Sequence, residues 1–182
     1  MSHQSEKFTR LAELGAGDFV HLTGSLEAHF IGVHDLLADW GARPALCDAG
    51  LYHAAYGTTK FTQIMVPLER RALVAGIIGE EAEAIVYRYC SCDRAIFWPT
   101  IGSAVPLPFL DRFTGETIDM QLEDLRDFCE LTIANSLQIA VADPAIAEQD
   151  ATYFFNLCYR LAPYLSAPAN RFARTLFPSL AA

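Results

Sequence analysis

The chain has 182 residues, of which 52% are hydrophobic and 19% are charged. This length and composition predict one globular domain with a full core, and they exclude a largely disordered chain. The formal net charge of −9 argues against nucleic acid and anionic membrane surfaces as partners, because binding to phosphates depends on lysine and arginine.

The first ten residues lack the apolar core of a signal peptide, and no stretch approaches the roughly 18 to 20 apolar residues of a membrane span. We therefore expect a cytoplasmic protein with no membrane partner. The five cysteines are an odd number spread over apolar helix faces, so we expect reduced, buried thiols rather than disulfides.

Helical periodicity starts with a short amphipathic helix over residues 6–14. A second helix is predicted to begin after Ser25, as its N-cap, and to stop at Gly41. His29 lies on the apolar stripe of this helix, which consists of Leu26, Phe30, Val33, Leu37 and Trp40. On a regular helix His34 is rotated by about 140° from His29, so we expect it to face solvent or to form a local hydrogen bond.

Pro44 is predicted to open the next helix, over residues 45–56, in which small residues permit close packing against a neighbour. A helix over 68–78 follows, with Leu73 among its inward residues. Another begins at Glu80, where acidic side chains stabilise the positive end of the helix dipole.

In the C-terminal half, Thr114-Gly115 predicts a turn between two short alternating runs, hence one short β-hairpin near residues 109–118. Long helices are predicted over 122–142 and 149–164. The expected fold is all-α: a helical bundle forming one domain over residues 1–182, in which the C-terminal helices within 121–167 pack on the N-terminal part.

Two histidines, His29 and His53, occur on successive apolar helices, and each is followed or preceded by short motifs. The motifs are His29-x-x-Gly, Gly50-Leu-Tyr-His53 with Tyr56-Gly-Thr58 after it, Gly79-Glu-Glu-Ala-Glu83 and Cys92-Asp93-Arg94. Over residues 20–95 this pattern resembles the HD superfamily of metallohydrolases, in particular the hydrolase domain of stringent-response nucleotide hydrolases. It is also similar to an uncharacterised bacterial and plant family with the same motifs. Ala54 stands where the HD superfamily has the aspartate of its name-giving pair.

The resemblance implies an HD-like helical bundle with a divalent metal, which would be zinc, manganese or iron. It implies His29, His53 and Asp93 as metal ligands, with His21 as the candidate that replaces the carboxylate missing at Ala54. Imidazole and carboxylate groups suit such ions, which lower the pKa of a bound water. The alternative for each histidine is a core residue with a hydrogen-bond partner.

Further candidates surround this expected site. Glu80 is a candidate general acid or base if it faces the metal, although stabilisation of the helix N-terminus explains it with fewer assumptions. Tyr56, Thr58 and Arg94 are candidate substrate-binding residues, and Arg94 would attract an anion. Asn135 and Gln138 on the long helix either line the same pocket or bond to each other.

The leading functional prediction is a metal-dependent hydrolase acting on a small anionic, phosphoester-like molecule. Cleavage of guanosine pyrophosphates is not expected, because Ala54 and Tyr56-Gly-Thr58 replace the acidic residues of that chemistry. Two alternatives remain: a non-haem iron oxygenase of the HD type, and a non-catalytic small-molecule-binding protein on a decayed HD fold. The apolar C-terminal helices are consistent with a homodimer.

Overall fold

A computed structural model of the chain describes residues 3–14, 20–21, 24–103 and 105–181. Ten α-helices lie within these residues: α1 (His3–Glu13), α2 (Leu26–Asp39), α3 (Pro44–Tyr52), α4 (Arg71–Ile78), α5 (Glu80–Ser91), α6 (Arg94–Phe97), α7 (Leu122–Ala142), α8 (Pro144–Gln149), α9 (Ala151–Leu161) and α10 (Ala167–Leu176). Short 3-10 helices are η2 (Leu68–Arg70), η3 (Trp98–Thr100), η4 (Ala162–Tyr164) and η5 (Pro178–Ala181). The predicted all-α fold with a short hairpin is confirmed.

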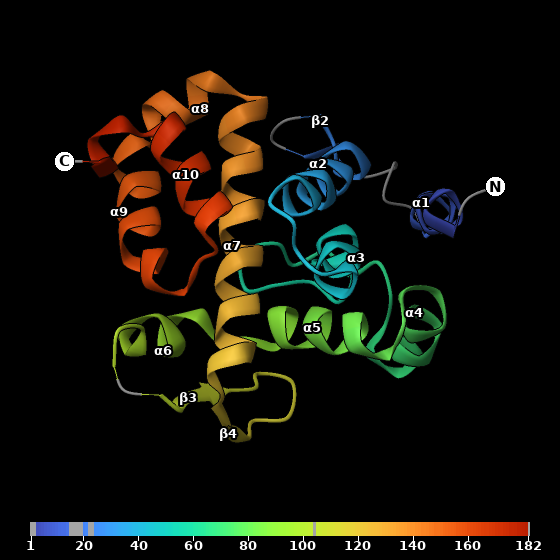
Figure 1. The fold of residues 1–182 in the computed structure, drawn as a ribbon. Helices are drawn as coiled ribbons and strands as arrows, with labels where there is room; N and C mark the ends of the chain where they lie inside the picture. The colour runs from blue at the N-terminus through green and yellow to red at the C-terminus, as the bar shows by residue number, and fades with distance from the viewer. Residues whose placement is uncertain (1–2, 15–19, 22–23, 104, 182) are drawn as a thin grey trace.

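The long helix α7 runs through the middle of the molecule (Figure 1). Helices α1 to α5 lie on one side of it, α8 to α10 lie on the other, and α6 and the hairpin lie at one end. The apolar side chains of α2, α3, α5 and α7 belong to one core cluster, which extends to the C-terminal helices. The central helix is therefore positioned to supply side chains to the N-terminal helices that carry the candidate site residues.

The hairpin consists of β3 (Leu107–Leu110) and β4 (Thr117–Met120), which pair antiparallel. Gly115 in its turn has a φ of 76°, a conformation that glycine adopts without strain. The strands extend slightly beyond the predicted range of 109–118. A second pair, β1 (Val20–His21) with β2 (Gly24–Ser25), was not expected.

Helix α2 begins as predicted, with the Ser25 side chain accepting a hydrogen bond from the backbone N–H of Ala28. The predicted stripe is buried. His34 bonds locally to Asp35, with 3.0 Å between His34 Nδ1 and Asp35 Oδ1, but it is buried rather than facing solvent. The reason is α1, whose Phe8 ring packs edge-on against His34 at 5.4 Å between ring centroids.

The expected close packing of small residues occurs at Gly50 of α3. A Cβ atom there would lie 2.7 Å from Cδ1 of Leu37 and 3.3 Å from Cγ1 of Val33, both on α2. Real Cβ atoms do not approach so closely, so the absent side chain allows the two helices to pack together. This packing places the end of α3, and with it His53, against α2.

All five cysteines are buried and free, as expected. Burial raises the pKa of the Cys90 and Cys92 thiols to about 12. None of the helices in the described part of the chain combines the length and apolar character needed to cross a membrane.

Candidate functional site

His29 and His53 meet in the core, as the resemblance implies. His29 lies on α2, and His53 directly follows α3 as its C-cap. Their rings are 5.3 Å apart between centroids and nearly perpendicular, at 75°. Only 2% of His29 and 3% of His53 is exposed, so both imidazoles lie in a protein environment rather than in water.

Both ring nitrogens of His29 contact side-chain amides of α7. Nε2 lies 2.8 Å from Oδ1 of Asn135, and Nδ1 is hydrogen-bonded to Oε1 of Gln138. Gly32 makes room for this contact, since a Cβ atom there would come within 2.8 Å of the Gln138 side chain. The glycine of the His29-x-x-Gly motif therefore allows an amide from a distant helix to reach the histidine.

The contacts continue through Tyr89 on α5. The Asn135 side chain donates a hydrogen bond of 3.0 Å to the Tyr89 hydroxyl, and the Tyr89 ring packs edge-on against His53 at 5.6 Å between centroids. Nδ1 of His53 donates to the backbone carbonyl of Gly50 at 2.8 Å. We call His29, His53, Tyr89, Asn135 and Gln138 the histidine cluster.

Asp93, the third predicted ligand, is the N-cap of α6. Its Oδ1 accepts hydrogen bonds from the backbone N–H groups of Ala95 at 3.0 Å and Ile96 at 3.2 Å. The backbone of His21 lies in β1, but its side chain is outside the described residues.

A divalent ion at this place would need donor atoms that are not already engaged in other contacts. His29 is engaged with two amides, Asp93 with a helix terminus, and Ala54 offers no donor atom. The described residues contain no group of three or more His, Cys, Asp or Glu side chains that could hold a metal. As placed, these side chains do not fit a metal centre, and the ligand set that includes His21 stays a prediction.

Arg94 lies against the histidine cluster, as its predicted role requires. Its guanidinium carbon is 4.6 Å from the centroid of the Tyr89 ring, and its Nη2 donates to the Tyr89 backbone carbonyl at 3.3 Å. Nη1 is buried and has no hydrogen-bond partner in the described part of the chain. Substrate binding by Arg94 stays a prediction.

Tyr56, another predicted substrate-binding residue, is part of a buried ionic network. Its hydroxyl donates to Oε1 of Glu83 at 2.8 Å, and Arg71 donates to both carboxylate oxygens of Glu83 at 2.7 Å each. Burial, then the hydrogen bond with Glu83, holds the pKa of Tyr56 far above its usual value. The phenol joins the segment after α3 to helices α4 and α5.

Thr58 closes a turn, since its Oγ1 accepts from the backbone N–H groups of Phe61 at 2.9 Å and Lys60 at 3.3 Å. Glu80 is exposed at the first residue of α5, whereas the histidines are buried. The structure thus does not bring Glu80 into the histidine cluster.

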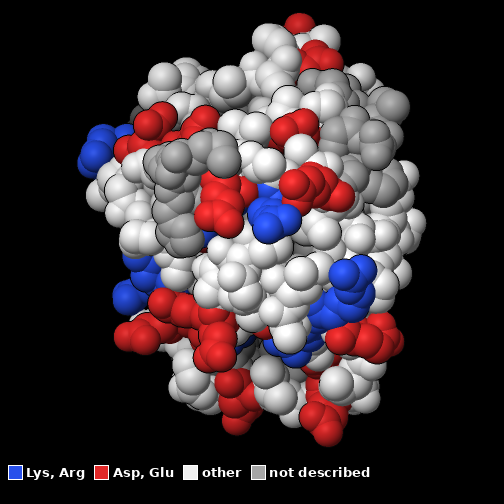
Figure 2. Space-filling model, turned by 90° about the vertical axis from the view of Figure 1, so that its right-hand side faces the viewer, with Lys and Arg blue, Asp and Glu red and all other residues white. Residues whose placement is uncertain are grey.

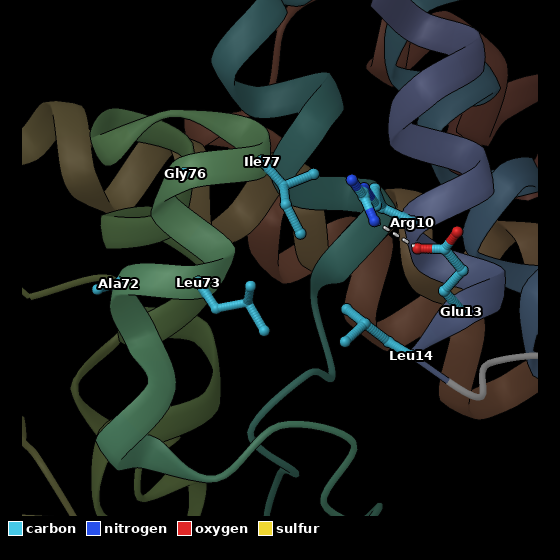
Figure 3. A pocket seen from close by; sticks show the side chains of 7 residues that line it. All are labelled: Arg10, Glu13, Leu14, Ala72, Leu73, Gly76 and Ile77. Carbon is cyan, nitrogen blue, oxygen red and sulfur yellow. Dashed lines mark hydrogen bonds and ion pairs between the residues drawn. The ribbon is translucent and has the colours of Figure 1, made fainter.

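A cleft of about 440 Å³ lies between α1 and α4 (Figure 3). Aliphatic side chains of Leu14, Leu73 and Ile77 line it, and Arg10 and Glu13 form an ion pair of 2.7 Å on its α1 side. Acidic and basic side chains surround an uncharged area on this side of the molecule (Figure 2).

The cleft was not predicted from the sequence. Leu73 was expected to face inward, but 37% of it is exposed, because it points into the cleft rather than into the core. Val74 and Ile78 of the same helix are buried. The sequence did carry one signal of the cleft: the short helix α4 has one more apolar residue than its buried face can hold.

Residues 10–94 match the model of a family described as a domain of unknown function (DUF6817). The match covers just under half of the chain and agrees with the predicted similarity to an uncharacterised family. It includes His29, His53 and Asp93 but not α7, which supplies Asn135 and Gln138. No curated protein and no solved structure matches the chain.

Proposed function

We propose that this protein is a non-catalytic binding protein for a small, largely apolar molecule. The observation that carries the proposal is the engagement of both ring nitrogens of His29 by Asn135 and Gln138. A histidine that ligates a metal or transfers a proton to a substrate needs one ring nitrogen available for that purpose. In this arrangement the histidine cluster stabilises the contact between α2 and α7 and leaves binding to another part of the molecule.

The cleft between α1 and α4 is the proposed binding site. Its volume of about 440 Å³ lies within the range of about 300–1,000 Å³ that is usual for small-molecule pockets. Leu14, Leu73 and Ile77 offer aliphatic surface to a ligand, and covering it would contribute roughly 25 cal/mol for each Å² removed from water.

Gly76 allows a sharp test, because it lines the cleft and a Cβ atom added there meets nothing within 4 Å. Binding of the neutral fluorophore aminoanthracene is measured by titration for the parent, for Gly76→Phe and for the control Gly76→Ala. The parent and the alanine variant should bind the probe, whereas the phenylalanine ring should fill the cleft and prevent binding. Equal binding by Gly76→Phe, or none by the parent, contradicts the proposal.

The second candidate is the metal-dependent hydrolase of a small anionic, phosphoester-like molecule, with the iron-dependent oxygenase as its variant. The 5.3 Å approach of the His29 and His53 rings and the position of Arg94 beside Tyr89 favour it. It requires the amides of Asn135 and Gln138 to release His29. Hydrolysis of p-nitrophenyl phosphate with added zinc or manganese, or oxygen uptake with added iron, that is lost in His53→Ala would support this candidate.

A further inference from the structure

We infer that the cleft between α1 and α4 binds a free amino acid with a large apolar side chain. The inference rests on the proposed function, because it assigns a ligand class to the same cleft. Two features of the lining carry it: a pair of opposite charges on one wall and aliphatic side chains on both walls.

The charges are the guanidinium of Arg10 and the carboxylate of Glu13, which are 2.7 Å apart on successive turns of α1. Figure 3 shows the two groups facing each other at the α1 side of the cleft. A ligand head with one charge would be attracted by one of these groups and repelled by the other. A head with both charges can pair its carboxylate with Arg10 and its ammonium with Glu13.

Free α-amino acids carry their ammonium and carboxylate on the same carbon atom, so the two charges are as close together as those of Arg10 and Glu13. A peptide terminus carries only one of them. The side chains of Arg10 and Glu13 are 52% and 55% exposed, so water already screens their mutual attraction and a ligand can insert between them at little cost.

The apolar part of the ligand would lie against Leu14, Leu73 and Ile77. Among the residues that the structure describes, Arg10 and Glu13 are the only polar side chains that line the cleft. A polar amino acid would lose hydration of its side chain without gaining a partner, so the lining favours an apolar one. The volume of about 440 Å³ accommodates an aromatic side chain together with its charged head.

The test is a competition experiment with bound aminoanthracene. Phenylalanine is compared with N-acetylphenylalanine, which has only the carboxylate, and with phenylalaninamide, which has only the ammonium. The same three ligands are titrated into Arg10→Gln and Glu13→Gln. The control is Glu6→Gln, which removes an acidic side chain from α1 outside the cleft.

We expect phenylalanine to bind the parent about threefold more tightly than either analogue, which is the effect of one ion pair with an exposed, water-screened group. Arg10→Gln should abolish its advantage over phenylalaninamide, and Glu13→Gln its advantage over N-acetylphenylalanine. Glu6→Gln should bind like the parent, and raising the salt concentration should weaken binding of phenylalanine.

Equal binding of phenylalanine and either analogue overturns the inference, as does phenylalanine binding that Gly76→Phe leaves intact. If aminoanthracene binds in the cleft and phenylalanine does not displace it, the ligand class is wrong and the proposed binding function stands. If neither binds, the proposed function itself fails.

Discussion

His29 joins two helices that are far apart in the sequence. Its hydrogen bonds reach 106 and 109 residues along the chain, to Asn135 and Gln138. Without this ring the partly buried amide oxygens of Asn135 and Gln138 would lose their histidine partner, so His29 contributes to the stability of the contact between α2 and α7.

We therefore expect His29→Ala to lower the free energy of unfolding by about 2–4 kcal/mol, from the cavity and from two amide oxygens that lose their histidine partner. Urea denaturation measures this change in the free energy of unfolding. The control Asp39→Ala, at an exposed position of the same helix, should change stability by less than about 0.5 kcal/mol. A loss of less than about 1 kcal/mol for His29→Ala would mean that the amides do not depend on the histidine.

Glu83 accepts hydrogen bonds from both Arg71 and Tyr56 although it is only 5% exposed. Glu83→Gln removes the charge that Arg71 faces, and we expect a loss of about 2–3 kcal/mol, moderated because Arg71 is 40% exposed. Glu80→Gln, an exposed change on the same helix, is the matched control for chemical denaturation. Similar stability of the two variants would contradict a structural role for the network.

Gly76 and Gly50 both lie in helices but have different surroundings. We therefore expect replacement by alanine to change stability in opposite directions at the two positions. Gly76→Ala on α4 adds a methyl group into open space, and its better helix propensity should stabilise the protein by about 0.5–1 kcal/mol. Gly50→Ala on α3 should destabilise it by about 1–3 kcal/mol, because the methyl group meets Leu37 and Val33. The melting temperatures of both variants test this expectation. Changes of the same sign in the two variants would contradict the packing described for Gly50 and Gly76.

Most helices could be predicted from local signals that the structure confirms. Ser25 caps α2, Pro44 begins α3, and α7 ends before Asp143-Pro144. Helix α3 is shorter than predicted, ending at Tyr52 instead of residue 56. The carbonyl of Ala55 accepts hydrogen bonds from the backbone N–H groups of Met65 and Val66, which draws residues 53–56 out of the helix.

The candidate site was less predictable. That His29 and His53 lie close together was implied by the resemblance to the HD superfamily, and their rings are 5.3 Å apart between centroids. Their partners Asn135 and Gln138 were identified only as pocket-lining or mutually bonded residues, because periodicity gives the buried face of α7 but not the helix that this face contacts. For Asp93, the local signal of an N-cap competed with the metal-ligand role that the resemblance implied.

For the whole molecule, the buried thiols predict loss of stability at alkaline pH. Burial raises the pKa of Cys90 and Cys92 from 9.0 to about 12 and that of Cys47 to about 11. Above pH 9 the folded protein thus keeps thiol protons that the unfolded chain releases. The contribution of these thiols to the free energy of unfolding is therefore fully present below pH 9 and decreases as the pH rises from 9 towards 12.

Melting temperatures between pH 8 and pH 11 test this dependence. We expect a continuous decrease above pH 9, and a shallower one in the double variant Cys90→Ala/Cys92→Ala. A melting temperature that does not change between pH 8 and pH 11 would contradict burial of the thiols.

We propose that His29 and His53 hold no metal ion, because Asn135 and Gln138 of α7 engage both ring nitrogens of His29. Metal analysis of protein purified without an affinity tag, with the parent and His53→Ala side by side, tests it most directly. We expect both proteins to contain far less than one equivalent of zinc, manganese or iron, even after incubation with each ion. About one equivalent in the parent that is lost in His53→Ala would contradict the claim and bring the metal-dependent enzyme to the front.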